Sequence, residues 1–223
     1  ATLCNAEAQI RALYGKASFQ FPPSGFTADD SFFARNASGD ERPQRMYVGY
    51  CETGGSLPDA VVRIFGVVKF ALQYLACKGT DPAVIDQFWT NVGYFNSLKD
   101  LGSADTLIID RVCSYAESLR RHKLNSYAEE VDMPRISNEY EYGELTSRKS
   151  AREITEVRNQ LDRQHYPSTA ALNYVLSSNM LSVGIDINRL GLMTVYGQPK
   201  ATAEYIQATS RVGRSNPGLV VVL

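Results

Sequence analysis

The clearest candidates for a chemical role in the chain are one amide and two guanidinium groups near its carboxyl end. They belong to the segment Gln207-Ala-Thr-Ser-Arg211-Val-Gly-Arg214, which fits the pattern Q-x-x-x-R-x-x-R. Residues three and four positions apart share a helix face, so a helix predicted over residues 202–212 would present the three side chains together. Two arginine forks suit a polyphosphate, whose oxygens accept their hydrogen bonds and whose charge they offset. A solvated helix face with two surface arginines is the plainer alternative.

A second segment places a glycine and an acid after a predicted strand at residues 172–176. It reads Ser178-Asn-Met-Leu-Ser-Val-Gly184-Ile-Asp186. Doubly wound sheets hold ligands at the carboxyl ends of their strands. Gly184 would let the backbone approach a ligand, and Asp186 could bind a ribose hydroxyl or a metal-bound water. A tight turn, with glycine for its conformation and aspartate as a cap, is the alternative.

These two segments, with Tyr205 before Gln207, resemble motifs VI and V of superfamily 2 helicases. The segment Tyr94-Phe-Asn-Ser-Leu98 is similar to motif IV, and Glu144-Leu-Thr-Ser-Arg148 stands at a strand end that follows it in that family. The resemblance covers most of residues 45–223. In detail, residues 190–211 are similar to the DrmA-like helicases of DISARM phage-defence systems.

The resemblance implies an α/β fold with three layers, in which a RecA-like central parallel sheet carries helices on both faces. It implies that Arg211 and Arg214 complete an ATP site, with Gln207 sensing the γ-phosphate, and that Gly184 and Asp186 belong to the ATP-binding residues. It also implies contacts to a single-strand backbone from a set of hydroxyl and amide side chains: Ser97, Thr146, Ser147, Ser178 and Asn179.

The implied cofactors are ATP and Mg²⁺, bound mainly by an N-terminal RecA-like domain that this chain lacks. No G-x-x-x-x-G-K-[ST] loop and no D-E-x-H-like box occurs in the sequence, so the chain by itself is not expected to hydrolyse ATP. The expected partners are single-stranded DNA or RNA, the N-terminal RecA-like domain of the same protein, and other defence-system proteins.

Two other functions remain open at this point. The first is a noncatalytic RecA-like scaffold that binds a protein partner through the acidic residues 129–144. The second is an unrelated doubly wound enzyme for a nucleotide-like substrate, which would need a Gly-rich phosphate loop or a catalytic base that the sequence does not offer.

The composition favours a folded domain with a local basic patch. The chain has 223 residues, 44% of them hydrophobic, which is enough for a real core. A net charge of −1 excludes a protein surface that is basic overall and binds nucleic acid over all of its area. Residues 145–214 hold nine Lys or Arg against five Asp or Glu, whereas residues 129–144 hold six acids and one Arg. Any contact with nucleic acid should therefore come from one part of the surface.

Apolar periodicity predicts alternating helices and strands, and hence a parallel sheet. Residues 22–45, rich in Pro, Gly, Ser, Asn and Asp, indicate a boundary. We therefore expect the tail of a first RecA-like domain and a linker at 1–44, and a second RecA-like domain, cut at its carboxyl end, at 45–223. The expected helices are 6–14, 57–78, one from 82, 103–123, 151–164 and 202–212. The expected strands are 18–21, 46–50, 92–95, 140–145, 172–176, 190–196 and 219–223.

Several residues receive a structural interpretation. The cysteines are far apart and have only His122 and His165 as possible co-ligands, so reduced, mostly buried thiols are expected rather than a zinc site. Trp89, Tyr94 and Phe95 are expected in the core rather than stacked on bases. No membrane span and no signal segment is expected, which favours a cytoplasmic protein.

Overall fold

The structure is a computed structural model that describes residues 5–19, 21, 44–127, 132–136, 141–163, 165–179 and 187–223. The chain divides into two compact units, Ala1–Arg42 and Pro43–Leu223. The first unit contains helix α1 (Ala6–Tyr14), which ends at the left-handed Gly15 as predicted. The strand predicted at 18–21 is wrong, because its described residues Ser18, Phe19 and Phe21 are not in a strand. Most of the predicted linker lies outside the described residues.

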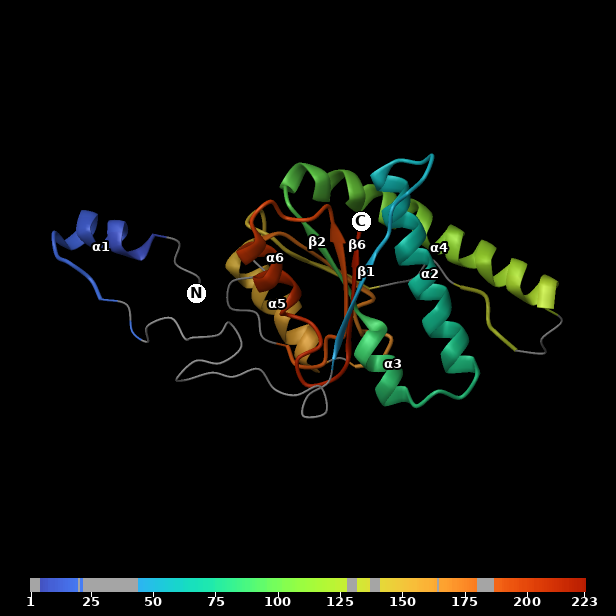
Figure 1. Cartoon of the computed structure of the whole chain (residues 1–223). Coiled ribbons are helices and arrows are strands. Elements are labelled where there is room, and N and C mark those ends of the chain that lie inside the picture. The colour runs from blue at the N-terminus through green and yellow to red at the C-terminus, as the bar shows by residue number, and fades with distance from the viewer. Residues whose placement is uncertain are drawn as a thin grey trace. The chain divides into compact units, whose positions relative to one another are not determined.

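The second unit is built on a six-stranded sheet in the order β1-β6-β5-β2-β4-β3 (Figure 1). Every neighbouring pair of strands is parallel. The strands are β1 (Arg45–Gly49), β2 (Asn91–Phe95), β3 (Tyr142–Leu145), β4 (Tyr174–Ser177), β5 (Leu192–Tyr196) and β6 (Gly218–Val222). All five residues of β2 and of β5 are buried, which explains why these strands are apolar without alternation.

Helices cover both faces of this sheet (Figure 1). One face carries α2 (Leu57–Cys77), α3 (Pro82–Trp89) and α4 (Leu98–Tyr127). The other carries α5 (Ala151–Arg163) and α6 (Thr202–Thr209). The predicted three-layer α/β architecture, with a central parallel sheet of RecA-like type, is confirmed.

Each face of the sheet has its own hydrophobic core. On the side of α5 and α6, Tyr94 and Met193 of the sheet pack with Leu161, Ala208 and Val212. On the side of α2 and α4, the neighbouring sheet residues pack with a second set of side chains, among them Val61, Phe65, Leu101, Ile108 and Val112. Because successive strand residues point to opposite faces, adjacent residues such as Tyr94 and Phe95 belong to different cores.

Two expectations, on the start of α4 and on the cysteines, need correction. Helix α4 begins at Leu98, five residues before the predicted start, because Ser97 caps it. Of the described cysteines Cys51 and Cys77 are exposed and only Cys113 is buried, so mostly buried thiols were a wrong prediction. Helix α2 does reach the length and apolarity of a membrane span. Its residues Val61 and Phe65 nevertheless lie in the core against the sheet.

Candidate nucleotide and nucleic-acid site

All five predicted nucleic-acid contacts lie at the end of the sheet where its strands finish, which we call the carboxyl edge. The register aligns Tyr94 of β2 and Leu145 of β3 with the same residue of β4, Ser177, so the three neighbouring strands end at one level. The predicted residues follow directly: Ser97 after β2, Thr146 and Ser147 after β3, and Ser178 and Asn179 after β4. Segments that are far apart in the sequence, from Ser97 to Asn179, are thus brought to one edge.

Ser97 caps the amino end of the long helix α4. Its Oγ accepts a hydrogen bond from the backbone N–H of Asp100 at 3.1 Å and donates to the Asp100 carboxylate at 2.6 Å. A helix amino end presents unsatisfied N–H groups and the positive end of the helix dipole, both of which favour an anion. Ser97 is half-buried, and Lys99 in the first turn is exposed. This helix end can therefore approach a phosphate group.

The side chain of Thr146 is engaged inside the protein. It is fully buried, and its hydroxyl donates to the carboxylate of Glu144. Arg148 donates to the same carboxylate through Nε at 2.5 Å and through a terminal nitrogen at 2.8 Å. A contact from Thr146 to a bound strand would have to come from its backbone, whereas the neighbouring Ser147 is exposed.

The charge of Glu144 is held in place by this network. Burial raises the pKa of its carboxyl group, but hydrogen bonds from Arg148 and Thr146 together lower the pKa by more than burial raises it. The pKa of Glu144 therefore lies below the ordinary value. Arg148 also lies 3.6 Å from Asp105 of α4, and its guanidinium is less than half exposed. The network ties the end of β3 to α4 at the carboxyl edge.

The end of β4 contributes one buried and one exposed polar residue. Ser178 is buried and donates to the side-chain oxygen of Asn179 at 3.4 Å, and Asn179 is exposed. At the neighbouring ends of β2 and β5, the Asn96 amide donates to the Gly197 carbonyl at 2.7 Å. Side-chain hydrogen bonds therefore join the strand ends across the edge.

The predicted ATP-binding residues Gly184 and Asp186 lie outside the described residues. They belong to the stretch between β4 and β5, of which residues 180–186 are not described. Their proposed roles stay predictions.

The expectation that Gln207, Arg211 and Arg214 share one helix face is wrong. Helix α6 ends at Thr209, so only Gln207 is helical. The chain then tightens into a turn, in which the N–H groups of Arg211 and Val212 donate to carbonyls three residues earlier. Gly213 follows with a φ of +64°, which an α-helix cannot contain. We call residues 210–216 the arginine turn.

The arginine turn lies at the other end of the strands, which we call the amino edge. The Gly213 N–H donates to the carbonyl of Leu190, just before β5, at 2.7 Å. Gly213 also packs against Gly218, the first residue of β6. The two arginines are therefore at the opposite edge from the five predicted nucleic-acid contacts, because α6 runs back along the sheet between β5 and β6.

Both arginines are half-buried and partly engaged by the protein. Nε of Arg214 donates to the carbonyl of Ser210 at 3.1 Å, which satisfies one carbonyl at the end of α6. Nε of Arg211 is buried. The guanidinium of Arg214 is thus held against the backbone of its own turn, and that of Arg211 is partly shielded from solvent.

Helix α6 is fixed to the sheet by two polar contacts. The hydroxyl of buried Tyr94 donates to the carboxylate of Glu204 at 2.8 Å, and burial followed by this hydrogen bond raises the pKa of Tyr94. The hydroxyl of Tyr47 lies 3.3 Å from that of Thr209, and the rings of Tyr47 and Tyr205 are 6.2 Å apart. These contacts hold α6 in place up to the residue at which the arginine turn begins.

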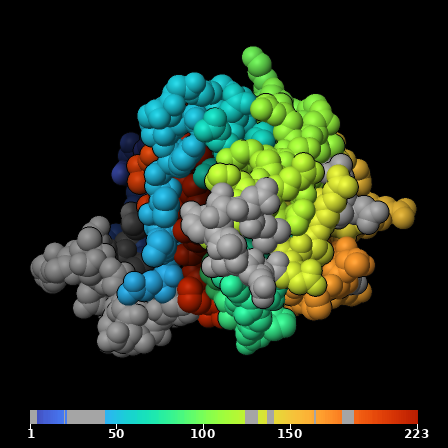
Figure 2. All heavy atoms as spheres, turned by 90° about the vertical axis from the view of Figure 1, so that its right-hand side faces the viewer, coloured from blue at the N-terminus to red at the C-terminus, as the bar shows by residue number. Residues whose placement is uncertain are grey.

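A residue that the sequence did not single out holds the arginine turn directly. Nε of Arg45, the first residue of β1, donates to the carbonyl of Val212 at 2.8 Å, and a terminal nitrogen lies 3.4 Å from the carbonyl of Gly213. These contacts span 167 and 168 residues, and no local pattern predicts them. The edge strand β1 that carries Arg45 lies at the surface beside β6 (Figure 2).

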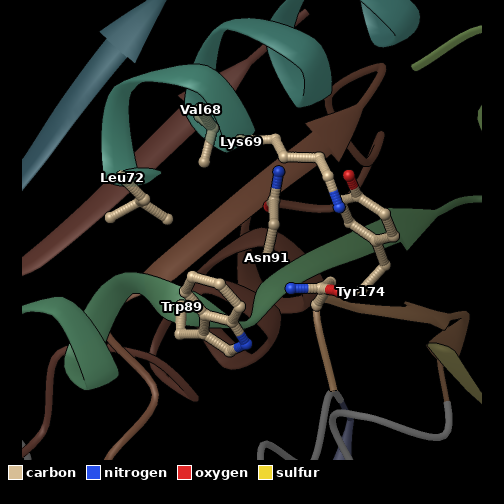
Figure 3. A pocket seen from close by; sticks show the side chains of 7 residues that line it. Val68, Lys69, Leu72, Trp89, Asn91 and Tyr174 are labelled. Atoms are coloured by element: carbon tan, nitrogen blue, oxygen red, sulfur yellow. The ribbon is translucent and has the colours of Figure 1, made fainter. Parts of the chain in front are cut away.

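A separate small cavity lies elsewhere at the amino edge, between α2 and the starts of β2 and β4. Figure 3 shows Lys69 of α2 above Trp89, Asn91 and Tyr174. Its volume of about 10 Å³ leaves room for one water molecule. Within the described part of the chain, Nδ2 of buried Asn91 has no hydrogen-bond partner, so this amide is the group that a water would satisfy. None of the predicted site residues lines the cavity.

The structural interpretation of the aromatic residues is confirmed for two of them. Tyr94 and Phe95 are buried in the two cores. Trp89 is half-buried and packs on Tyr166, with ring centroids 4.5 Å apart. His165, which the sequence leaves without an acidic neighbour, lies 3.3 Å from the Asp86 carboxylate.

Comparison with known proteins agrees with this geometry. The model of the helicase conserved C-terminal domain matches residues 104–216. The chain is 41% identical over 224 residues to the DISARM protein DrmA of Bacillus paralicheniformis, covering 100% of this chain and 19% of that protein. The structure of the DUF1998 helicase MrfA bound to DNA and AMPPNP is similar in fold. It has a TM-score of 0.54 and 15% identity, and the match covers 100% of this chain and 24% of that one.

The chain thus spans about a fifth of the length of the curated relative that it matches. The family match covers α5, α6 and the arginine turn, together with β3 to β5 and most of α4. On these grounds the chain belongs to the helicase conserved C-terminal domain family.

Proposed function

We propose that this chain is the C-terminal motor domain of an ATP-dependent helicase or translocase, and that its two edges have different tasks. The arginine turn would complete an ATP site whose phosphate loop and magnesium ligand belong to the N-terminal RecA-like domain of the same protein. The carboxyl edge would hold the backbone of single-stranded DNA or RNA. The DrmA relative supports a place among defence-system proteins, and the MrfA structure holds both DNA and a nucleotide analogue.

The observation that carries the proposal is the placement of two arginines on one rigid turn. Arg211 and Arg214 flank Val212 and Gly213, whose carbonyls accept hydrogen bonds from Arg45. Val212 lies in the core, and Gly213 packs against Gly218. Arginine forks that are already positioned can bind a triphosphate without the entropy cost of ordering long side chains. In phosphoryl transfer such an arginine is worth about 10³ to 10⁵ in turnover.

When bound, ATP with Mg²⁺ supplies the phosphoryl group and the free energy of its hydrolysis. The residues of this chain that fit the triphosphate are Arg211 and Arg214, as donors with positive charge, together with the amide of Gln207. Gly184 and Asp186, which the resemblance to motif V assigns to the ATP-binding residues, would link the state of the nucleotide to the contacts with the strand. Closure of the two motor domains around the nucleotide would shift the carboxyl edge along the strand.

At the carboxyl edge, the contacts would go to phosphates and not to bases. Ser147 and Asn179 offer accessible hydroxyl and amide groups. The hydroxyl of Ser97 already donates to Asp100, so Ser97 would act by capping α4, whose amino end offers backbone N–H groups. Ser178 and Thr146 are buried, so they would act through their backbone or by supporting their neighbours. Contacts of this kind predict binding without sequence preference.

The decisive experiment measures ATP turnover in the full-length protein, with and without single-stranded DNA or RNA. Arg211→Ala is expected to lower kcat by at least about 10³-fold. Arg152→Ala is the matched control, since Arg152 is an exposed arginine of α5 that pairs only with Glu156 among the described residues. Undiminished turnover in Arg211→Ala would remove the catalytic role of the arginine turn. Full-length protein without any ATPase would favour the noncatalytic scaffold.

The binding task is tested separately by single-strand affinity. Ser147→Ala and Asn179→Ala are each expected to weaken binding by a few-fold for every sequence tested, because each removes one phosphate contact. Ser118→Ala, at an exposed position of α4 that is more than five turns from Ser97, is the control. Wild-type affinity in both test variants would place the strand elsewhere.

A further inference from the structure

The side chain of Arg45 hydrogen-bonds the peptide carbonyls between the two arginines of the turn. Its Nε donates to Val212 at 2.8 Å, and its second contact, to Gly213, is longer at 3.4 Å. Its other terminal nitrogen lies 3.4 Å from the Tyr47 hydroxyl, which keeps the guanidinium plane in place. The contact joins the edge strand β1 to the segment after α6.

The position of this guanidinium has a physical reason. A buried peptide carbonyl outside a helix or strand needs a hydrogen bond from a side chain, from another backbone N–H group or from water. Val212 and Gly213 follow the end of α6, and both are buried, so water cannot satisfy their carbonyls fully. A half-buried cation with several donors satisfies both at once.

The packing around Arg45 leaves little room for another arrangement. A Cβ on Gly213 would lie 3.5 Å from Nε of Arg45, and a Cβ on Gly218 would lie 3.3 Å from its Cγ. The side chain therefore lies over the contact of two glycines, Gly213 and Gly218. A bulkier residue at either glycine would displace Arg45 and the turn together.

We infer that Arg45 is a positioning residue for Arg211 and Arg214. By fixing the peptide group between the two arginines, Arg45 sets the backbone positions from which both side chains extend toward the nucleotide. The inference rests on the proposed function of the arginine turn. It adds a residue that lies outside the matched helicase segment, on the first strand of the second unit.

The test uses full-length protein and compares Arg45→Gln and Arg45→Lys with Arg211→Ala. A displacement of about 1 Å at a catalytic group can cost about 10²-fold in rate. Arg45→Gln is therefore expected to lower kcat for ATP by about 10- to 100-fold while changing KM for ATP and the affinity for a single strand by less than about threefold. Arg45→Lys keeps the charge and one donor, and is expected to recover part of kcat.

The outcomes separate the two proposals. If Arg211→Ala is inactive and Arg45→Gln has normal kcat, the positioning role is refuted and the proposed function stands. If both variants turn over ATP normally, both proposals fail. If Arg45→Gln lowers the melting temperature and weakens strand binding by about the same factor as it lowers kcat, and Arg45→Lys recovers none of kcat, then Arg45 is merely structural. That outcome refutes the inference. Arg63→Gln, which removes an exposed arginine bound to Glu52 on another part of the second unit, controls for loss of one cation.

Discussion

Gly213 and Gly218 pack backbone against backbone: a Cβ built on Gly213 would lie 2.7 Å from the Cα of Gly218. Gly213 also has a φ of +64°, a conformation that residues with a side chain rarely adopt. The arginine turn can therefore approach the start of β6 only because both positions are glycine.

Gly213→Ala should destabilise the protein by at least about 2 kcal/mol, because strain at positive φ and overpacking each cost about 1 to 3 kcal/mol. Chemical denaturation of the second unit measures this change. Gly79→Ala is the control, since Gly79 has a φ of +82° with no atom within 4 Å of its would-be Cβ. It isolates the cost of the backbone conformation. Equal losses in the two variants would show that the glycine contact is unimportant.

Tyr94→Phe should destabilise the fold by roughly 1.5 to 3 kcal/mol, the usual range for a hydrogen bond to a charged group. The variant removes the donor that faces Glu204 at 2.8 Å and loosens α6 on the sheet. A double-mutant cycle with Glu204→Gln measures the coupling, expected to be about 1 kcal/mol. Strictly additive effects would mean that the two side chains do not depend on each other.

Glu144→Gln should remove stability that depends on pH. The folded-state pKa of Glu144 lies below its ordinary value, because hydrogen bonds from Arg148 and Thr146 outweigh burial. The unfolded chain thus binds the proton more readily, so this stabilisation is present above the unfolded pKa of about 4.3 and disappears as the pH falls through the folded pKa. Denaturation of wild type and variant between pH 7 and pH 3 should show a gap that narrows at the acid end. A constant gap would contradict the assignment.

Lys69→Met should stabilise the protein at neutral pH. Lys69 is 7% exposed, and burial lowers the pKa of its ammonium group in the folded state. Between that lowered pKa and the unfolded value of about 10.4, the unfolded chain holds more protons, so wild-type stability rises with pH in this window. The advantage of the variant should shrink as the pH approaches 10. Lys99→Met, at an exposed position, is the control. A variant less stable than wild type at pH 7 would show that the contact of Lys69 with the Tyr174 ring outweighs its burial cost.

Much of the fold could be predicted from the sequence because burial on both faces makes the central strands continuous apolar runs. The six strands of the second unit were all expected, with boundaries within about two residues of those observed. The wrong strand at 18–21 lacks this pattern, since Ser18-Phe-Gln-Phe21 is a short segment in which polar and apolar residues alternate. The early start of α4 depends on the Ser97 cap, a signal that was present in the sequence as a serine three residues before an aspartate.

The sequence alone determined the family, the order of the elements and the residue types that can meet phosphate, since these depend on local pattern and on motifs within ten residues. Only the tertiary structure decided that the arginines leave the helix at Thr209, and that they lie at the opposite edge from Ser97, Ser147 and Asn179. It alone brought Arg45 to Val212 across 167 residues. The physical reason is that a helix end and a hydrogen bond between distant segments are set by what packs against them, and in a parallel sheet those neighbours come from remote parts of the chain.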